Sequence, residues 1–156
     1  SSCSRQLAYS CQIRCDCPDV TPPARPALQS VRFMSCRVQH VDEGETHDGA
    51  ELVLYLGVDG IGDKYRFDNV HDNTTLTLPD VAVVKVDPVL DGEVWCFGVE
   101  EDLGDSMLDR DDPMPWAVGF LPRVSHEANA AFAPGRVELR AADNRGNVFV
   151  VTCAVT

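Results

Sequence analysis

The chain has 156 residues, of which 25 are acidic and 13 basic, so its formal net charge at pH 7 is −12. This excess of negative charge repels nucleic acids and anionic lipids. We therefore expect no nucleic-acid partner, and membrane contact only through a bridging calcium ion. The length suits a single domain. No apolar run approaches the roughly 18 residues of a membrane span, so we expect no transmembrane segment.

The seven cysteines fall into two groups, four within the first seventeen residues and three far apart. This usage indicates disulfide bonds and an oxidising compartment, and hence a secreted or cell-surface protein. A metal site in the dense N-terminal group is the alternative, although the spacing differs from that of paired C-x2-C ligands. The odd count leaves at least one thiol unpaired within the chain, and the pairing cannot be deduced from the sequence. The cysteines are Cys3, Cys11, Cys15, Cys17, Cys36, Cys96 and Cys153.

Residues 22–26 include three prolines, which favour an extended, semi-rigid connector. We therefore divide the chain into a Cys-rich N-terminal arm with its connector (residues 1–26) and a β-sandwich domain (residues 27–156). The arm holds too little apolar material for a core of its own. We expect it to be held by disulfides, to dock on the domain, or to bind a protein partner or another copy of the chain. Its apolar residues are Leu7, Ala8, Tyr9, Ile13 and Val20.

After the connector, short β-like runs alternate with clusters of Gly, Pro, Asn and Asp. Asp143–Asn147 predicts a turn between the last two strands, and Ser125–Phe132 predicts one short helix because Ser125 can cap it. The fold class expected is therefore all-β, an antiparallel two-sheet sandwich of about eight strands. The expected strands are Val31–Val38, Glu51–Leu56, Lys64–Phe67, Thr74–Leu78, Val81–Val86, Glu93–Val99, Trp116–Leu121, Arg136–Ala141 and Asn147–Val155.

The two tryptophans, Trp95 and Trp116, are expected in the core. Trp116 follows Pro113 and Pro115, so the rim of an interface is its alternative position.

Two segments concentrate the negative charge. Glu100–Asp112 holds seven carboxylates with Arg110 as the one cation, and Asp42–Glu51 holds five with none, so together they contain 12 of the 25 acids. Because like charges this close repel, folding or a counter-ion must offset the repulsion. Calcium takes six to eight oxygen ligands, and two acidic loops at one end of a sandwich could share an ion. The alternative is solvated surface charge.

From Val31 to the C-terminus, the order of features resembles C2 and C2-like β-sandwich domains, including the secreted bacterial versions. In those domains one acidic loop precedes a strand of the type seen in Ala50–Leu56, and a second follows a strand containing Trp or Phe, here Val94–Val99. The chain departs from the family in its Glu at the first acidic position and in the long stretch Asp102–Asp109. It also lacks the lysine-rich strand of lipid-binding members, which weakens the case for membrane binding.

The resemblance implies a calcium site and assigns it residue by residue. Glu100 and Asp102 stand for the acid-x-acid pair, and Asp111 or Asp112 for the later acid of the same loop. Asp42 and Asp48 stand for the pair in the first loop. The cofactor expected is therefore Ca²⁺.

No catalytic motif is present: the chain lacks a G-x-S-x-G elbow, an H-E-x-x-H helix, a P-loop and a dinucleotide-binding fingerprint. The four histidines do not pair at helix or strand spacing, and we expect them at the surface. His40 and His47 flank the first acidic segment and are alternative ligands for a transition metal. We therefore expect no catalytic residues and no enzyme.

The sequence thus predicts a secreted or cell-surface structural protein that acts by binding, adhesion or assembly, with calcium at one tip. A small secreted hydrolase using paired carboxylates is one alternative. A calcium-dependent membrane-targeting module is the other.

Overall fold

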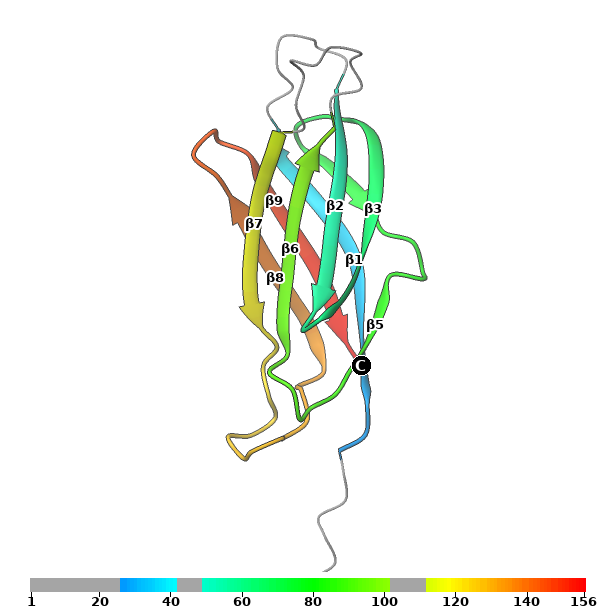
Figure 1. The fold of residues 1–156 in the computed structure, drawn as a ribbon, viewed down its shortest axis with the longest axis vertical. Coiled ribbons are helices and arrows are strands. Elements are labelled where there is room, and N and C mark those ends of the chain that lie inside the picture. The colour runs from blue at the N-terminus through cyan, green and yellow to red at the C-terminus, as the bar shows by residue number, and fades with distance from the viewer. Residues whose placement is uncertain (1–25, 42–48, 102–111) are drawn as a thin grey trace, which may run out of the picture.

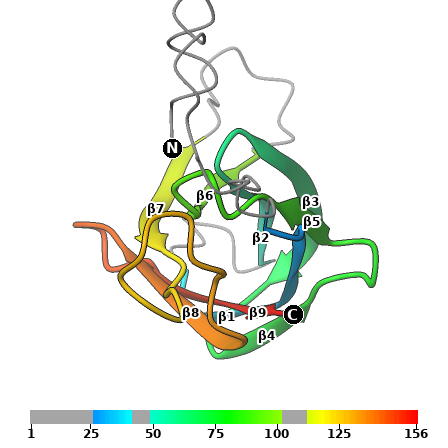
Figure 2. The same ribbon diagram turned by 90° about the horizontal axis from the view of Figure 1, so that it is seen from below.

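The structure is a computed structural model that describes residues 26–41, 49–101 and 112–156. Its strands form two antiparallel sheets packed face to face, seen side-on in Figure 1 and end-on in Figure 2. They are β1 (Gln29–His40), β2 (Ala50–Val58), β3 (Ile61–Val70), β4 (Thr74–Thr77), β5 (Val83–Val86), β6 (Glu93–Glu100), β7 (Asp112–Phe120), β8 (Gly135–Ala142) and β9 (Val148–Val155). The prediction of an all-β, two-sheet antiparallel sandwich is confirmed, with nine strands in the described residues instead of about eight.

The first sheet has the order β4-β1-β9-β8, and β5 also pairs with β1. β5 pairs with the first part of β1 (Arg32 opposite Val83), and β4 pairs with the last part (Val38 opposite Thr74). The two short strands therefore follow one edge of β1 in succession. Between β4 and β5 the chain leaves the sheet and then returns to it. Where it returns, just before β5, the Phe33 amide donates to the Ala82 carbonyl at 2.8 Å.

The second sheet has the order β3-β2-β6-β7. β2 and β3 form a hairpin in which Val58 lies opposite Ile61, so Asp59 and Gly60 make the turn. β2 also pairs with β6, which joins segments far apart in the sequence. Within the described part of the chain β7 pairs only with β6 and is an edge strand, with a register shift between Phe97 and Val99.

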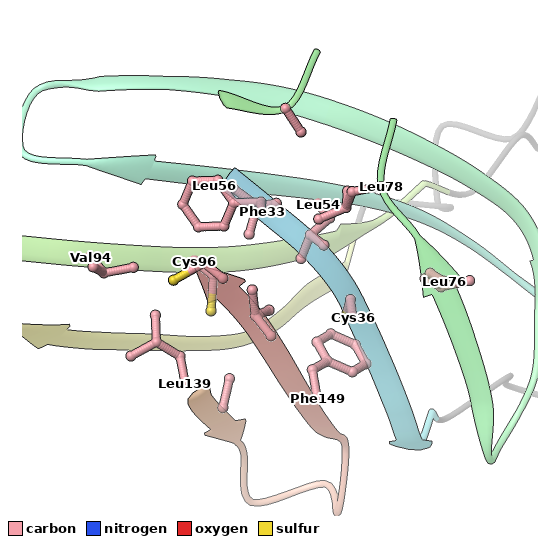
Figure 3. Packing of buried hydrophobic residues seen from close by; sticks show 14 of the residues in the cluster. Phe33, Cys36, Leu54, Leu56, Leu76, Leu78, Val94, Cys96, Leu139 and Phe149 are labelled. Carbon is pink, nitrogen blue, oxygen red and sulfur yellow. The ribbon is translucent and has the colours of Figure 1, made fainter. Parts of the chain in front are cut away.

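The core lies between the two sheets and is made of alternate side chains from facing strands (Figure 3). On β2, the inward residues are Leu52, Leu54 and Leu56, each at most 1% exposed. Facing them from the first sheet are Phe33 and Phe149, both fully buried. Burial of each such side chain stabilises the fold by roughly 1.5–3 kcal/mol, so this alternation holds the sheets together.

The three strand cysteines, Cys36, Cys96 and Cys153, are free thiols buried in this core. The expectation of disulfides is therefore wrong for these three, and the four cysteines of the arm lie outside the described residues. Desolvation raises the pKa of the Cys36 thiol to about 12 and those of Cys96 and Cys153 to about 11. At neutral pH they are uncharged and act as small apolar side chains.

The predicted hairpin near the C-terminus is confirmed. β8 and β9 pair along their lengths, and the carboxylate of Asp143 organises the turn between them. Its Oδ1 accepts from the amides of Arg145 and Asn147, both at 3.0 Å, and its Oδ2 accepts from the Asn147 side chain at 2.8 Å.

The short helix predicted over Ser125–Phe132 is wrong: the part of the chain that the structure describes contains strands and turns but no helix. Ser125 does accept the Glu127 amide, at 3.3 Å, as a helix cap would. However, Asn129 adopts a left-handed φ of 60°, and Arg123 pairs with Phe132 in an isolated bridge. A run this short has little helical stability of its own, so these tertiary contacts decide its conformation.

Arg123 is the main polar contact of this loop. Its guanidinium donates to the Pro88 carbonyl at 2.7 Å, the Ala130 carbonyl at 2.8 Å and the Leu90 carbonyl. It also lies over the Phe132 ring, 4.5 Å from the ring centroid. Arg123 therefore ties the loop after β7 to the loop before β6.

In the described residues, no helix is long and apolar enough to cross a membrane.

We expect Arg123→Ala to lower the free energy of unfolding by about 2–3 kcal/mol, because three carbonyl acceptors lose a charged donor. Urea denaturation followed by circular dichroism measures this. Arg140→Ala, at an exposed position on β8, is the matched control and should change stability by less than about 0.5 kcal/mol. Equal effects of the two substitutions would contradict the assigned role of Arg123.

Candidate functional site

The described ends of the two acidic segments lie together at one end of the second sheet. On β2 and β6, Leu52 lies opposite Glu100, and the Glu101 amide donates to the Glu51 carbonyl at 2.9 Å. On β6 and β7, Glu100 lies opposite Asp112. β2, which follows the first segment, is therefore in one sheet with β6 and β7, which flank the second, whereas β1, which precedes the first segment, belongs to the other sheet. We call this region the acidic end.

Of the six predicted calcium ligands, the structure brings the backbones of Glu100 and Asp112 together as a strand pair. The Glu100 side chain is half-buried. Within the described residues, no group of three or more His, Cys, Asp or Glu side chains is arranged to hold a metal ion. The other four predicted ligands lie outside those residues; they are Asp42, Asp48, Asp102 and Asp111.

A basic residue that the sequence analysis missed lies at the acidic end. Arg66 of β3 forms an ion pair with Glu101, and its Nε also donates to Asp68 at 3.1 Å. The two ion pairs raise the pKa of Arg66, with the hydrogen bond to Asp68 as the main cause. One carboxylate of the second acidic segment, which follows β6, is thus neutralised by a side chain of β3, two strands away in the same sheet. The sequence does indicate that the Arg66 side chain points outward, because alternate residues of its strand are polar. It does not indicate the partner of Arg66, because that depends on the order of the strands in the sheet.

The start of the first acidic segment is anchored by Asp72. Its Oδ1 accepts the Val41 amide at 2.8 Å, and its Oδ2 lies 2.9 Å from Nδ1 of His40. The Val41 hydrogen bond, and then the hydrogen bond to His40, hold the pKa of Asp72 below its ordinary value of 3.8. His40, an alternative metal ligand by sequence, therefore pairs with a carboxylate, while His47 lies outside the described residues.

A second candidate site covers the outer surface of β6 and β7. Alternate side chains of these strands point away from the core, and several are large and exposed: Trp116 is 70% exposed, Phe120 63%, Val118 47% and Phe97 38%. Trp116 is thus not a core residue. With the adjoining Tyr55 and Trp95, these residues form the surface that we call the aromatic face: Tyr55, Trp95, Phe97, Trp116, Val118 and Phe120.

The rings of this face are in ordered contact. Phe97 stacks on Tyr55 with centroids 4.5 Å apart and an interplanar angle of 7°, and Trp95 lies 6.1 Å from Phe97. Trp95 is half-buried because it lies over two glycines of the β2–β3 hairpin, where a Cβ at Gly57 or Gly62 would come within 2.2 or 2.6 Å of its ring. Its Nε1 donates to the Asp59 carbonyl at 2.8 Å. Trp95 is therefore a fixed part of the outer surface, and its predicted position in the core is wrong, as it is for Trp116.

An open hollow of about 590 Å³ lies on the aromatic face between β6 and β7. Its lining is almost wholly apolar and comes from both strands, including Phe97, Val99, Pro113 and Trp116. The register shift at Phe97 and Val99 falls at this hollow. A surface of this kind suits apolar side chains better than a sugar or a charged metabolite, which would need polar partners.

No protein-family model matches the chain, and no curated protein matches it in sequence. Function is therefore inferred from the geometry of the acidic end and the aromatic face.

We expect NMR titration to place the pKa of Asp72 below 3.8, the ordinary value. Because a depressed pKa in the folded state favours the charged form, this contribution to stability is present above about pH 4 and is lost as the pH falls through the folded pKa. His40→Ala should raise the pKa of Asp72 only part of the way to the ordinary value, because the Val41 amide still donates a hydrogen bond to the Asp72 carboxylate. A wild-type pKa at or above 3.8 would contradict the anchoring contact.

We expect Gly57→Ala to lower the free energy of unfolding by about 1–3 kcal/mol, because its Cβ would overlap Trp95 and the Ile61 carbonyl. Gly60→Ala is the matched control: a Cβ there meets nothing within 4 Å, so stability should change by less than about 0.5 kcal/mol. Urea denaturation compares the two, and tryptophan emission should shift in the Gly57 variant alone. An unperturbed Gly57 variant would mean that Trp95 does not lie over the hairpin.

Proposed function

We propose that the chain is a secreted or cell-surface β-sandwich that acts by binding, adhesion or assembly rather than by catalysis, and that its two acidic segments share a calcium ion at the acidic end. The ion would be structural, neutralising carboxylates and holding the two segments together. The residues proposed to bind it are Asp42, Asp48, Glu100, Asp102, Asp111 and Asp112.

The observation that carries this proposal is the backbone join between the two acidic segments. The Glu101 amide bonds to the Glu51 carbonyl, and Glu100 lies opposite Asp112. The polypeptide therefore leaves the first segment through β2, and enters and leaves the second through β6 and β7, at one end of one sheet, whereas it enters the first segment from β1 of the other sheet. Carboxylate oxygens from two such segments form the all-oxygen donor set that calcium prefers.

Charge provides the second argument. Residues 42–48 and 102–111 contain eight carboxylates and one arginine, while Arg66 neutralises Glu101 beside them. Carboxylates anchored this close together repel one another, and a divalent cation removes much of that cost. The proposed ion thus stabilises the folded state more than the unfolded one, in which the two segments separate.

The order of the strands also supports the C2-like type that the sequence suggested. The first acidic segment links β1 to β2, and the second links β6 to β7. These are the positions that the resemblance implies, before the strand containing Ala50–Leu56 and after the strand containing Trp95. The C2-like assignment is part of the proposal.

Two other functions give different results in simple assays. A calcium-dependent membrane-targeting module would pellet with vesicles containing phosphatidylserine when calcium is added, whereas an assembly protein would stay in the supernatant. A carboxylate-dependent hydrolase would need no ion, and its melting temperature would be the same with calcium and with chelator.

We expect calcium to raise the melting temperature of the dialysed protein. At a concentration of 100 times the dissociation constant, a ligand stabilises the folded state by about 2.7 kcal/mol. For a domain of this size, that corresponds to a shift of roughly 5–10 °C. Differential scanning calorimetry with calcium and with EDTA measures the shift, and isothermal titration calorimetry gives the stoichiometry.

Asp102→Asn combined with Asp111→Asn should remove most of this shift. Glu138→Gln is the matched control, since it also turns a carboxylate into an amide but lies exposed on β8, and it should keep the whole shift. Equal melting temperatures of the wild-type protein with calcium and with EDTA would refute the proposed site. If the double variant kept the shift, the proposal that the second acidic segment binds the ion would be wrong.

A further inference from the structure

We propose that residues 1–25, which include the N-terminal arm and most of its connector, dock on the aromatic face of their own chain, with the apolar side chains of the arm in the hollow between β6 and β7. This inference does not depend on the proposed calcium site, because the two concern different surfaces.

The aromatic face is a continuous apolar surface without a covering element among the described residues. Trp116 and Phe120 are each more than 60% exposed, and the hollow beside them has an apolar lining. The opposite side of β7 packs against the first sheet: at Gly119, a Cβ would lie 2.7 Å from Leu139 of β8. Contiguous exposed apolar surface of this kind marks a contact site in soluble proteins.

The edge of β7 indicates how an occupant is recognised. Among the described strands β7 is at the edge of its sheet, but two of its first four residues, Pro113 and Pro115, carry no amide hydrogen. Proline on an edge strand hinders the addition of another strand. An occupant would therefore bind through side chains packed on the aromatic rings, and not by extending the sheet.

The arm begins within reach of this surface. At the start of β1, the Gln29 side chain accepts the Phe132 amide and donates to the Phe132 carbonyl, both at 2.8 Å. This contact places the start of β1 beside the loop that follows β7. At about 3.1 Å per residue in an extended chain, the connection from Pro26 to Ile13 spans roughly 40 Å. β7 itself is about 30 Å long at the usual rise, so Ile13, Tyr9 and Leu7 can all reach the hollow.

Charge favours the arm over a second copy of the chain. Residues 1–25 carry a net charge of +1, whereas residues 26–156 carry −13. Two copies approaching each other would each bring a net charge of −12 and repel, while the arm meets its own domain with the opposite sign. Covalent attachment also gives the arm a millimolar effective concentration at the face. Its charged residues are Arg5, Arg14, Arg25, Asp16 and Asp19.

Photo-crosslinking of the full chain tests the proposal. A benzophenone side chain replaces Val118 on the aromatic face, or Val83 on β5 of the other sheet as the matched control. Both valines are outward and partly exposed, at 47% and 41%. After illumination and reduction, we expect crosslinks from position 118 to residues 1–25, at least five times more abundant than from position 83 and at the mass of one chain.

Variants of the arm provide the second readout. Leu7→Ser combined with Ile13→Ser should reduce these crosslinks at least five-fold and at least double the acrylamide quenching constant of tryptophan fluorescence, because Trp116 becomes uncovered. Gln6→Ser combined with Gln12→Ser is the matched control and should change neither quantity. Crosslinks at the mass of two chains would assign the face to a second copy and overturn the proposal. Arm crosslinks no more abundant from position 118 than from position 83 would overturn it as well.

Discussion

The pairing of β2 with β6 is the interaction on which both candidate sites depend. It aligns Leu52 with Glu100 at one end of the strands and Val58 with Val94 at the other. At the first end, this register joins the two acidic segments through backbone hydrogen bonds. Along the strands it places Phe97 on Tyr55 and Trp95 over Gly57. A shift of one residue would send the outward rings into the core, so the same register maintains the core, the acidic end and the aromatic face.

β6 has an unusual distribution of side chains. Its inward residues are the smaller ones, Val94, Cys96 and Gly98, while Trp95 and Phe97 face outward. The reason lies across the core, where Phe33 and Phe149 of the other sheet occupy the space that larger β6 side chains would need. At Gly98, a Cβ would come within 3.0 Å of the Phe149 ring. The interior is filled from the first sheet, and the aromatic area of β6 and β7 is left for the outer surface.

Local patterns were sufficient to predict the strands, because alternation and turn residues act within a few positions. Each of the nine expected segments overlaps an observed strand.

The helix over Ser125–Phe132 could not be judged from local sequence, since Arg123 sets the conformation of that loop by hydrogen bonds to carbonyls of a distant loop. Trp95 and Trp116 were both misplaced for a similar reason: both faces of Val94–Val99 and Trp116–Leu121 are apolar, so the sequence does not indicate which one is inside. The pairing of Arg66 with Glu101 required knowledge of strand order. The six predicted calcium ligands were chosen by resemblance, and the structure describes the backbones of only two of them.

The distribution of charge connects the two surfaces. A chain with a net charge of −12 is kept apart from its copies by long-range repulsion, and that repulsion acts against self-association through the aromatic face. Pro113 and Pro115 act in the same direction at short range, because they hinder edge-to-edge pairing along β7. An occupant of this face must therefore be apolar at the contact and not strongly negative overall. The arm meets both conditions, since its leucine, tyrosine and isoleucine come with more arginine than aspartate. A calcium ion bound at the acidic end would lower the net negative charge and so weaken the repulsion between copies of the chain. Assembly through other surfaces would then depend on calcium. The aromatic face, covered by the arm, would take no part in it.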